Sequence, residues 1–392
     1  MTFLSNRINS IKPSPTLAVT DKASALKREG RDIISLSAGE PDFDTPEHIK
    51  AAAGEAMQKG DTKYTAVDGT PALKQAIIDK FKRENQLNYT SKQILVSSGA
   101  KHSIFNLLGA VINPGDEVII PAPYWVSYPD MVLLFDGKPV CVATSIESRL
   151  KITPEQLARH ITPKTKLLIL NSPSNPSGMN YSKAELKALG DVLVRHPQVL
   201  ICSDDIYEHI LWGKEPFSNL VNACPELYER TIVVNGVSKA YAMTGWRIGY
   251  AAGPEKIIGA MKKMQSQSTS NPCSIAQAAA VAALNGDQSC LQTMRQAFKE
   301  RHDFLIAGLN ATPGFHCLSA DGAFYAFPQV AGAIKTLGLQ DDLAFSEYLL
   351  EKANVAVVPG SAFGMPGFIR LSYATSKKIL EAALQRINSS LK

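Results

Sequence analysis

The 392-residue sequence lacks most of the motifs that mark specialised classes of protein. Its six cysteines form no Cys-x-x-Cys pair, and its seven histidines are dispersed without a His-Glu-x-x-His motif, so no metal site is indicated. The glycine-rich Walker A and Gly-x-Gly-x-x-Gly sequences that cradle nucleotide phosphates are also missing. No hydrophobic run approaches the roughly 20 residues that a membrane span needs.

The charges give the chain only a mild positive balance, +5 from 41 basic and 36 acidic residues. The basic residues are scattered and form no run that would follow a nucleic-acid backbone. The N-terminus has no apolar segment of the kind found in secretory signals, and several cysteines lie in apolar segments. We therefore expect a cytoplasmic protein with reduced thiols that binds neither membranes nor nucleic acids.

The pattern of apolar residues predicts an α/β fold. Short Val/Ile/Leu-rich runs predict strands at residues 94–97, 117–120, 140–143, 166–170, 199–203, 231–235 and 248–252. Helical periodicity occurs at 101–112, 183–196 and 255–265. Buried strands that alternate with amphipathic helices indicate a largely parallel sheet covered on both faces.

From about residue 274 the pattern changes to long helices at 274–284 and 291–310, followed by strand-like pieces at 323–327, 355–358 and 369–372. This change predicts a second, smaller α+β domain. We expect a large domain over 46–285, and a small domain over 286–392 that also includes an N-terminal arm over 1–45. The arm shows no strong period, and we expect it to wrap across the domain junction or a partner subunit.

The most informative residue is Lys239, which follows the β-branched run Thr231-Ile232-Val233-Val234. A lysine at the end of a buried strand is costly unless chemistry uses it, because desolvation disfavours its charge. A neutral amine is a nucleophile towards an aldehyde, and Arg247, eight positions later, offers a bidentate clamp for a phosphate. An aldehyde and a phosphate together suggest pyridoxal 5′-phosphate.

Polar residues also follow the other predicted strands, where ligands of open parallel sheets bind. Each of these segments has an ordinary structural interpretation as a cap, a turn or a core residue. Together they supply the groups that pyridoxal phosphate requires. They comprise a helix start at Ser98-Gly99-Ala100-Lys101 for an anion, Trp125 for stacking, the amide of Asn175, and the acid and phenol of Asp204 and Tyr207.

With these residues the chain resembles the fold-type I aminotransferases of class I, and within them the bacterial aspartate aminotransferase subgroup Ib. The resemblance covers essentially the whole chain. It is carried by the lysine segment 235–249 and by residues 37–43, 63–65, 123–128, 171–178, 203–208 and 369–375. It implies a mostly parallel seven-stranded sheet between helices, with a smaller α+β domain.

The resemblance implies a role for each matching residue. Lys239 would form the covalent aldimine with pyridoxal phosphate and move a proton, Asp204 would hold the pyridine nitrogen protonated, and Tyr207 and Asn175 would bind the phenolate oxygen. Trp125 would stack on the ring. The phosphate would be bound by Ser98, Gly99, Ala100, Ser238 and Arg247, and by Tyr64 from the other subunit of a homodimer with shared active sites. Three departures from the family pattern are Asp205, often glutamate, Ser177, often threonine, and Gly236, where some relatives have serine.

The substrate assignments also come from the resemblance. Arg370 would bind the α-carboxylate, helped by Gly39, Trp125 and Asn175, while Lys101, assisted by Ser14 and Thr16, would bind a distal carboxylate. This set favours aspartate aminotransferase, which exchanges L-aspartate and 2-oxoglutarate for oxaloacetate and L-glutamate. A basic residue at Lys12 accompanies activity on prephenate. The alternatives are an aminotransferase for aromatic or other amino acids, a lyase, and a non-catalytic effector domain.

Overall fold

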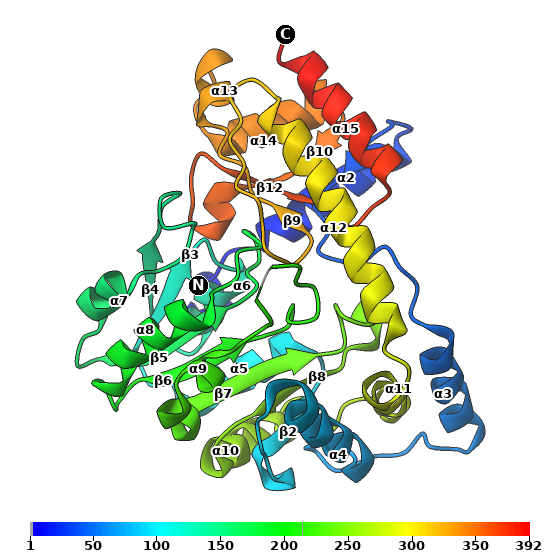
Figure 1. Ribbon diagram of the computed structural model, residues 1–392, viewed down its shortest axis with the longest axis vertical. Helices are drawn as coiled ribbons and strands as arrows, with labels where there is room; N and C mark the ends of the chain where they lie inside the picture. Colours follow the sequence, from blue (N-terminus) through cyan, green and yellow to red (C-terminus); the bar gives the residue numbers. More distant parts are fainter. Residues whose placement is uncertain (1–2, 214) are drawn as a thin grey trace.

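The computed structural model describes residues 3–213 and 215–392. A seven-stranded sheet with helices on both faces forms one end of the molecule, and two small sheets with long helices form the other (Figure 1). None of the helices in these described ranges combines the length and the apolar character needed to cross a membrane.

The central sheet has the strand order β2-β8-β7-β6-β5-β3-β4. All neighbouring strands are parallel except β8, which runs antiparallel to both β2 and β7. The strands are β2 Ile94–Ser97, β3 Glu117–Ala122, β4 Lys138–Ala143, β5 Thr165–Asn171, β6 Leu200–Asp204, β7 Thr231–Gly236 and β8 Gly249–Ala252.

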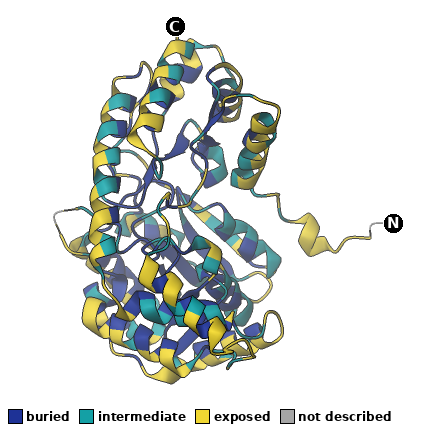
Figure 2. Ribbon diagram, turned by 90° about the vertical axis from the view of Figure 1, so that its right-hand side faces the viewer, coloured by how far each residue is buried: buried dark blue, intermediate teal, exposed yellow. Residues whose placement is uncertain are grey.

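Alternate strand residues pack on opposite layers of helices, as the two-residue period of a strand requires. Ile232 and Val234 pack in the layer of α5 and α10, whereas Val233 between them packs with α3, α4 and α11. The strand cores are buried and appear dark in Figure 2, while exposed residues line the outer helices. The helices of this half are α3 Glu47–Gln58, α4 Pro71–Lys80, α5 Ala100–Val111, α6 Ser127–Leu134, α7 Pro154–His160, α8 Lys183–Val194, α9 Leu220–Ala223, α10 Glu255–Ser266 and α11 Ser274–Asn285.

The second half contains an antiparallel sheet β11-β12-β9 and a parallel pair β1-β10. Because Ile34 pairs with Val355, the N-terminal segment is joined to the C-terminal part of the chain. The division of the domains at residues 45 and 285 remains a prediction. The elements are α1 Asn6–Asn9, α2 Pro15–Arg28, β1 Ile34–Ser35, α12 Ser289–Asn310, β9 Tyr325–Ala326, α13 Ala331–Thr336, α14 Asp342–Lys352, β10 Val355–Ala356, β11 Val358–Pro359, β12 Ile369–Ser372 and α15 Lys377–Ser390.

The predicted fold class is confirmed, and all seven predicted strands of the large sheet are present with ends shifted by at most two residues. The predicted strand 355–358 is divided into β10 and β11, which belong to different sheets. The N-terminal segment, which shows no strong period in sequence, contains the 14-residue helix α2 at Pro15–Arg28. Only Ala23 of this helix is buried, so its apolar stripe is weak, although Ser14 before Pro15 is a typical helix start.

Candidate active site

A cavity of about 410 Å³ lies outside the carboxyl ends of the central strands, between the sheet, α2 and the β9–β12 pair. The sheet therefore places its strand-end residues where open parallel sheets bind ligands. Most of the predicted site residues line this one cavity. They are Ser14, Thr16, Gly39, Ala100, Lys101, Trp125, Asn175, Asp204, Tyr207, Ser238, Lys239, Arg247 and Arg370.

Lys239 follows β7 and directs its amine into the cavity. Its Nζ donates a hydrogen bond to the carbonyl oxygen of Gly39 over 2.6 Å. Desolvation, reinforced by the positive charge of Arg247, lowers the pKa of the amine to about 8, although Glu40 and Asp204 oppose the shift. An amine with this pKa is partly neutral near pH 7 to 8, which is the state that attacks an aldehyde.

Asp204 is the last residue of β6 and is 4% exposed. Its Oδ2 accepts a hydrogen bond of 2.5 Å from the hydroxyl of Tyr128, and burial raises the pKa of the carboxyl to about 6. Asp205 is differently placed, because its carboxylate accepts hydrogen bonds from Ser203 and Asn219 and does not line the cavity. Successive side chains of a strand point to opposite faces, and these two adjacent acids differ in the same way. Asp204 faces the cavity, whereas Asp205 is directed away from it towards Ser203 and Asn219.

Arg370 on β12 lies on the opposite side of the cavity and is 2% exposed. Its Nη1 donates to Asn175 Oδ1 over 2.9 Å, and its Nη2 donates to the carbonyl oxygen of Ser37 over 2.6 Å. Its buried Nε has no hydrogen-bond partner among the described residues. A buried guanidinium with unused hydrogen-bonding capacity that lines a cavity is suited to a carboxylate ligand.

The predicted anion seat lies where β2 turns into α5. Gly99 has φ +91°, and a Cβ there would lie 2.2 Å from Arg247 Nη2, so only glycine allows the guanidinium to approach. The amides of Ser98 and Gly99 already donate to His102 Nδ1 and to the carbonyl oxygen of Ser97. The donors that remain are the first amides of α5 at Ala100 and Lys101, because the start of a helix lacks intrahelical acceptors.

Two further details concern this seat. Ser98 and Gly99 do not line the main cavity, but Ser98 lines an adjoining one together with Lys12, Lys101 and Arg247. Gly236, the last residue of β7, has no side chain and adds no hydroxyl to this region. A Cβ at Gly236 would lie 2.9 Å from the carbonyl oxygen of Ile248, so the close pairing of β7 and β8 explains the glycine.

Lys101 and Trp125 lie side by side at one wall of the cavity. The Lys101 Nζ is 4.8 Å from the centre of the Trp125 ring. Desolvation, followed by repulsion from Arg247, lowers the pKa of the Lys101 amine. Ser14 and Thr16, at the start of α2, line the same cavity. Lys12 does not line this cavity but lines two neighbouring ones. Tyr64 is 92% exposed and does not line the cavity of its own chain.

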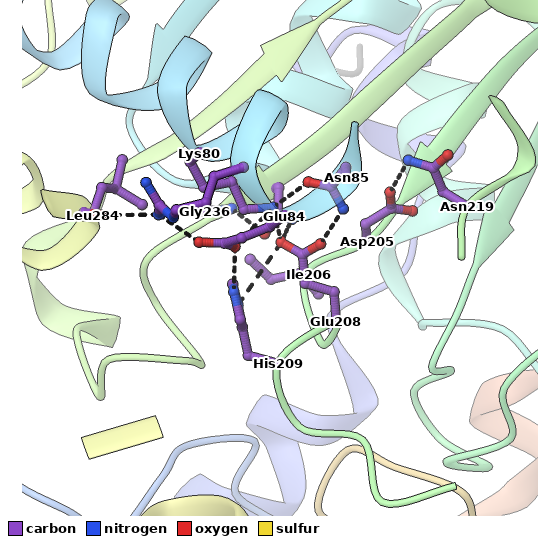
Figure 3. A network of polar contacts seen from close by, with 12 residues as sticks. Lys80, Glu84, Asn85, Asp205, Ile206, Glu208, His209, Asn219, Gly236 and Leu284 are labelled. Atoms are coloured by element: carbon purple, nitrogen blue, oxygen red, sulfur yellow. Dashed lines mark hydrogen bonds and ion pairs between the residues drawn. The ribbon is translucent and has the colours of Figure 1, made fainter. Parts of the chain in front are cut away.

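A buried polar network supports the strand ends from behind (Figure 3). The ammonium of Lys80, at the end of α4, pairs with Glu208 and donates to Asn85 Oδ1 over 2.7 Å. Glu208 also accepts from Asn85 over 2.8 Å and from Asn235 over 2.7 Å. Since Glu208 follows Tyr207 and Asn235 lies on β7, the network fixes the two strand ends that carry the phenol and the lysine.

Two residues of the site were not singled out from the sequence. Tyr128 lies in the first turn of α6, three positions after Trp125, and its ring contacts Trp125 edge-to-face at 5.3 Å. Tyr325 lines the cavity from β9, and its hydroxyl is 2.9 Å from that of Tyr207. Trp125 lies just before α6, and the turn closed by the bond from the Tyr128 amide to the Trp125 carbonyl brings the two rings together. The position of Tyr325 depends on strand pairing across the small sheet.

The fold and the cavity are those of an enzyme that acts on a small ligand, and comparison with known proteins identifies its family. The family of aminotransferases of class I and II matches residues 31–387, and the chain belongs to this family. An aminotransferase moves an amino group from an amino acid to a 2-oxo acid, so its substrates are small molecules of these two kinds.

Individual relatives are similar over their full length. An aspartate/prephenate aminotransferase of Nitrosomonas europaea is 62% identical, and the alignment covers 99% of both chains. The crystal structure of an aspartate aminotransferase from Rhizobium meliloti superimposes with a TM-score of 0.96 at 51% identity, covering 100% of this chain and 99% of that one. The aspartate aminotransferase from Thermus thermophilus with maleate gives a TM-score of 0.94 at 45% identity and covers 100% of both chains.

Proposed function

We propose that the chain is an aspartate aminotransferase that uses pyridoxal 5′-phosphate held at Lys239. It exchanges L-aspartate and 2-oxoglutarate for oxaloacetate and L-glutamate. The observation that carries the proposal is the amine of Lys239, with its pKa lowered to about 8, in one cavity with a buried arginine, Arg370. The relatives named aspartate aminotransferase support the choice of substrate.

The groups around the cavity fit this cofactor. The amine of Lys239 suits its aldehyde, the carboxyl of Asp204 suits its ring nitrogen, and the phenol of Tyr207 suits its ring oxygen. The helix start at Ala100 and the guanidinium of Arg247 suit its phosphate. When bound, pyridoxal phosphate supplies an aldehyde that takes the amino group and a ring that draws electrons from the substrate's Cα.

The chain's own residues would then divide the work. The amine of Lys239 would accept the proton from the substrate's Cα and would supply a proton to the carbon of the cofactor's aldehyde group. Asp204, whose pKa of about 6 leaves it ionised at neutral pH, holds a proton on the ring nitrogen. Tyr207 and Asn175 would hydrogen-bond to the ring oxygen of the cofactor, and Trp125 would stack on its ring.

Two cations would select a dicarboxylate. Arg370 binds the α-carboxylate common to all substrates, and Lys101 binds the distal carboxylate, assisted by Ser14 and Thr16. Support comes from the Thermus thermophilus relative, whose structure contains maleate, itself a dicarboxylate. Lys12, beside Lys101 in the adjoining cavity, adds a further positive charge. Together with the Nitrosomonas europaea relative, this charge favours prephenate as a second acceptor.

The functional unit in this proposal is a homodimer with shared active sites. Tyr64 is a large aromatic residue that is 92% exposed, and the arm with α1 projects from the body of the chain (Figure 2). Exposed apolar side chains on the arm, Phe3 at 99% and Leu4 at 63%, suit burial against a second copy. Tyr64 of one chain would reach the phosphate in the other.

The test is a half-reaction screen with purified protein loaded with pyridoxal phosphate. Single amino acids are added without an acceptor, and the absorbance of the bound cofactor is followed as the amino group is transferred. We expect aspartate and glutamate to react much faster than alanine or phenylalanine. A protein that prefers phenylalanine would support the aromatic alternative. Lys239→Ala should remain folded, lose the absorbance band of the lysine-bound cofactor and lose transamination. Full activity in this variant, without added amines, would refute the assignment.

A further inference from the structure

Tyr325 lies between two groups to which the proposed function gives separate tasks. Its hydroxyl is 2.9 Å from the hydroxyl of Tyr207, and its ring faces the guanidinium of Arg370, with 4.6 Å from Cζ to the ring centre. Tyr325 is 0% exposed, and Tyr207 and Arg370 are 3% and 2% exposed. All three side chains are thus fixed by packing and exchange little with water.

The pairing of β9 with β12 explains why Tyr325 meets Arg370. Ser372 is the direct partner of Tyr325 in this antiparallel ladder. Arg370 lies two residues before Ser372, so it points to the same face as Tyr325 and is its diagonal neighbour. The small sheet therefore presents an aromatic face and a guanidinium to the cavity as one unit.

The hydroxyl of Tyr325 connects this unit to the large sheet. Tyr207 follows β6, so the bond between the two hydroxyls crosses from the small sheet to the end of the central sheet. The hydroxyl also abuts Gly39, where a Cβ would lie 2.8 Å from its oxygen. Gly39 is the residue whose carbonyl accepts the bond from Lys239. The hydroxyl of Tyr325 thus contacts both Tyr207 and Gly39, the residue that holds the amine of Lys239.

The two phenols have one proton each, and either oxygen can be the donor. Burial raises the pKa of both phenols, and the positive charge of Arg370 offsets part of the rise at each. The pKa of Tyr207 is raised well above its ordinary value, by burial and then by Tyr325. Because Tyr207 has a single proton and would give it to the ring oxygen of the bound cofactor, Tyr325 would then have to be the donor across the bond between the two hydroxyls.

We propose that Tyr325 is a positioning residue that orients and polarises Tyr207 through its hydroxyl, while its ring holds Arg370 in the plane that receives the α-carboxylate. The inference rests on the proposed function, because Tyr207 acts on the ring oxygen of the cofactor. A donor to that oxygen stabilises its negative charge, so the neighbouring nitrogen, joined to Lys239, releases its proton at lower pH. Weakening the donor raises the pKa of that nitrogen.

The experiment titrates the absorbance of the bound cofactor with pH in holoenzyme without substrate. Tyr325→Phe keeps the ring and removes only the hydroxyl. We expect the midpoint to rise by about half a pH unit, the equivalent of one modest hydrogen bond. Tyr207→Phe should raise it further, and Tyr325→Phe should add nothing in the Tyr207→Phe background. Tyr373→Phe is the matched control, because that buried hydroxyl donates to the carbonyl oxygen of Ala323 over 3.5 Å and does not line the cavity.

The role of the ring is measured separately by the affinity for maleate, an unreactive dicarboxylate. Tyr325→Phe should bind maleate within about twofold of the unmodified protein, whereas Tyr325→Leu should bind it at least about fivefold more weakly because the ring over Arg370 is lost. A Tyr325→Phe midpoint equal to that of the control, or an equal rise in both backgrounds, would overturn the inference while leaving the proposed function intact. If the unmodified protein forms no lysine-bound chromophore, both are refuted.

Discussion

Lys239 and Gly39 are joined by a hydrogen bond of 2.6 Å from Nζ to the carbonyl oxygen, across 200 residues of sequence. The bond brings the end of β7 against the segment between β1 and α3, which also supplies the carbonyl of Ser37 to Arg370. The amine is therefore held in a partly desolvated position before any ligand arrives, and its pKa is lowered to about 8.

The first prediction concerns the capture of an aldehyde by this amine. Free pyridoxal, which has no phosphate, should react with cofactor-free protein at a rate that rises with pH and reaches half its maximum near pH 8. At pH 7 only about one tenth of an amine with this pKa is neutral. Because Arg247 is the largest charged contributor, Arg247→Gln should move the midpoint upward even though pyridoxal cannot use the phosphate seat. A midpoint near 10.5 would show an ordinary lysine.

The second prediction concerns the acid at the end of β6. Asp204→Asn should retain the cofactor and lose at least about 100-fold in kcat, because a neutral amide cannot hold a proton on the ring nitrogen. The matched control is Asp205→Asn. This neighbouring acid does not line the cavity and is held by hydrogen bonds from Ser203 and Asn219, so Asp205→Asn should leave kcat close to that of the unmodified protein. A kcat of Asp204→Asn within threefold of normal, about 0.7 kcal/mol of barrier, would contradict the role.

The third prediction tests the shared sites of a homodimer. Tyr64→Phe should weaken cofactor binding, and Lys239→Ala should abolish activity. In a hybrid of the two variants, the chain with an intact Lys239 receives Tyr64 from its Lys239→Ala partner, so one site in each hybrid should regain normal cofactor affinity. Mixing followed by titration with pyridoxal phosphate measures this recovery. A second hybrid pairs a Tyr64→Phe chain with an Arg370→Ala chain that keeps its Tyr64. The same recovery of cofactor affinity is expected in the site of the Tyr64→Phe chain. Activity that stays with an isolated monomer in sedimentation would contradict it.

The sequence was sufficient to predict the central sheet, because its strands other than the edge strand β4 are largely buried on both faces and appear as short apolar runs between helical periods. The residues at the strand ends follow from that sheet, which is why Lys239, Asp204 and Asn175 could be grouped beforehand. Tyr325 could not be placed in the same way. Its contact with Arg370 depends on the register of the antiparallel strands β9 and β12, which are about 45 residues apart in sequence. Its contact with Tyr207 depends on how the small sheet packs against the large one.

Helix α2 was missed for a different reason. It lies on the surface beside the cavity, with only Ala23 buried, so burial leaves almost no apolar period in its sequence. The polar network behind the site was equally hidden, since Lys80 and Glu208 are far apart in sequence and each looks like an ordinary surface charge. Sequence periodicity therefore predicts elements that bury an apolar face, and it does not predict a surface helix such as α2. It also does not predict contacts between polar residues that are distant in sequence, such as Lys80 and Glu208.

The fourth prediction concerns the stability contributed by that network. Lys80→Met leaves Glu208 buried without its cation, so the free energy of unfolding in urea should fall by about 3–5 kcal/mol at pH 7.5. Lys80 lowers the pKa of Glu208 against the effect of burial, so without Lys80 that pKa rises. Protonation of Glu208 then relieves the penalty, and the loss should be smaller at pH 5. Lys187→Met removes an exposed pair with Asp191 and should leave the free energy of unfolding nearly unchanged, because solvent screens exposed ion pairs. Equal losses for the two variants would contradict the assignment.

The fifth prediction concerns the choice between acidic and neutral substrates. Lys101→Met keeps an apolar stem beside Trp125 and removes only the charge. Because Lys101 would meet only a distal carboxylate, kcat/KM for aspartate should fall at least tenfold while that for alanine changes little. A desolvated charge pair is worth about 2–5 kcal/mol, and even the low end exceeds tenfold. Arg370→Ala should instead weaken aspartate and alanine together, since both carry the α-carboxylate. Equal losses for the two substrates in Lys101→Met would show that the amine serves the phosphate seat beside Arg247, and specificity for dicarboxylates would then rest on Ser14 and Thr16.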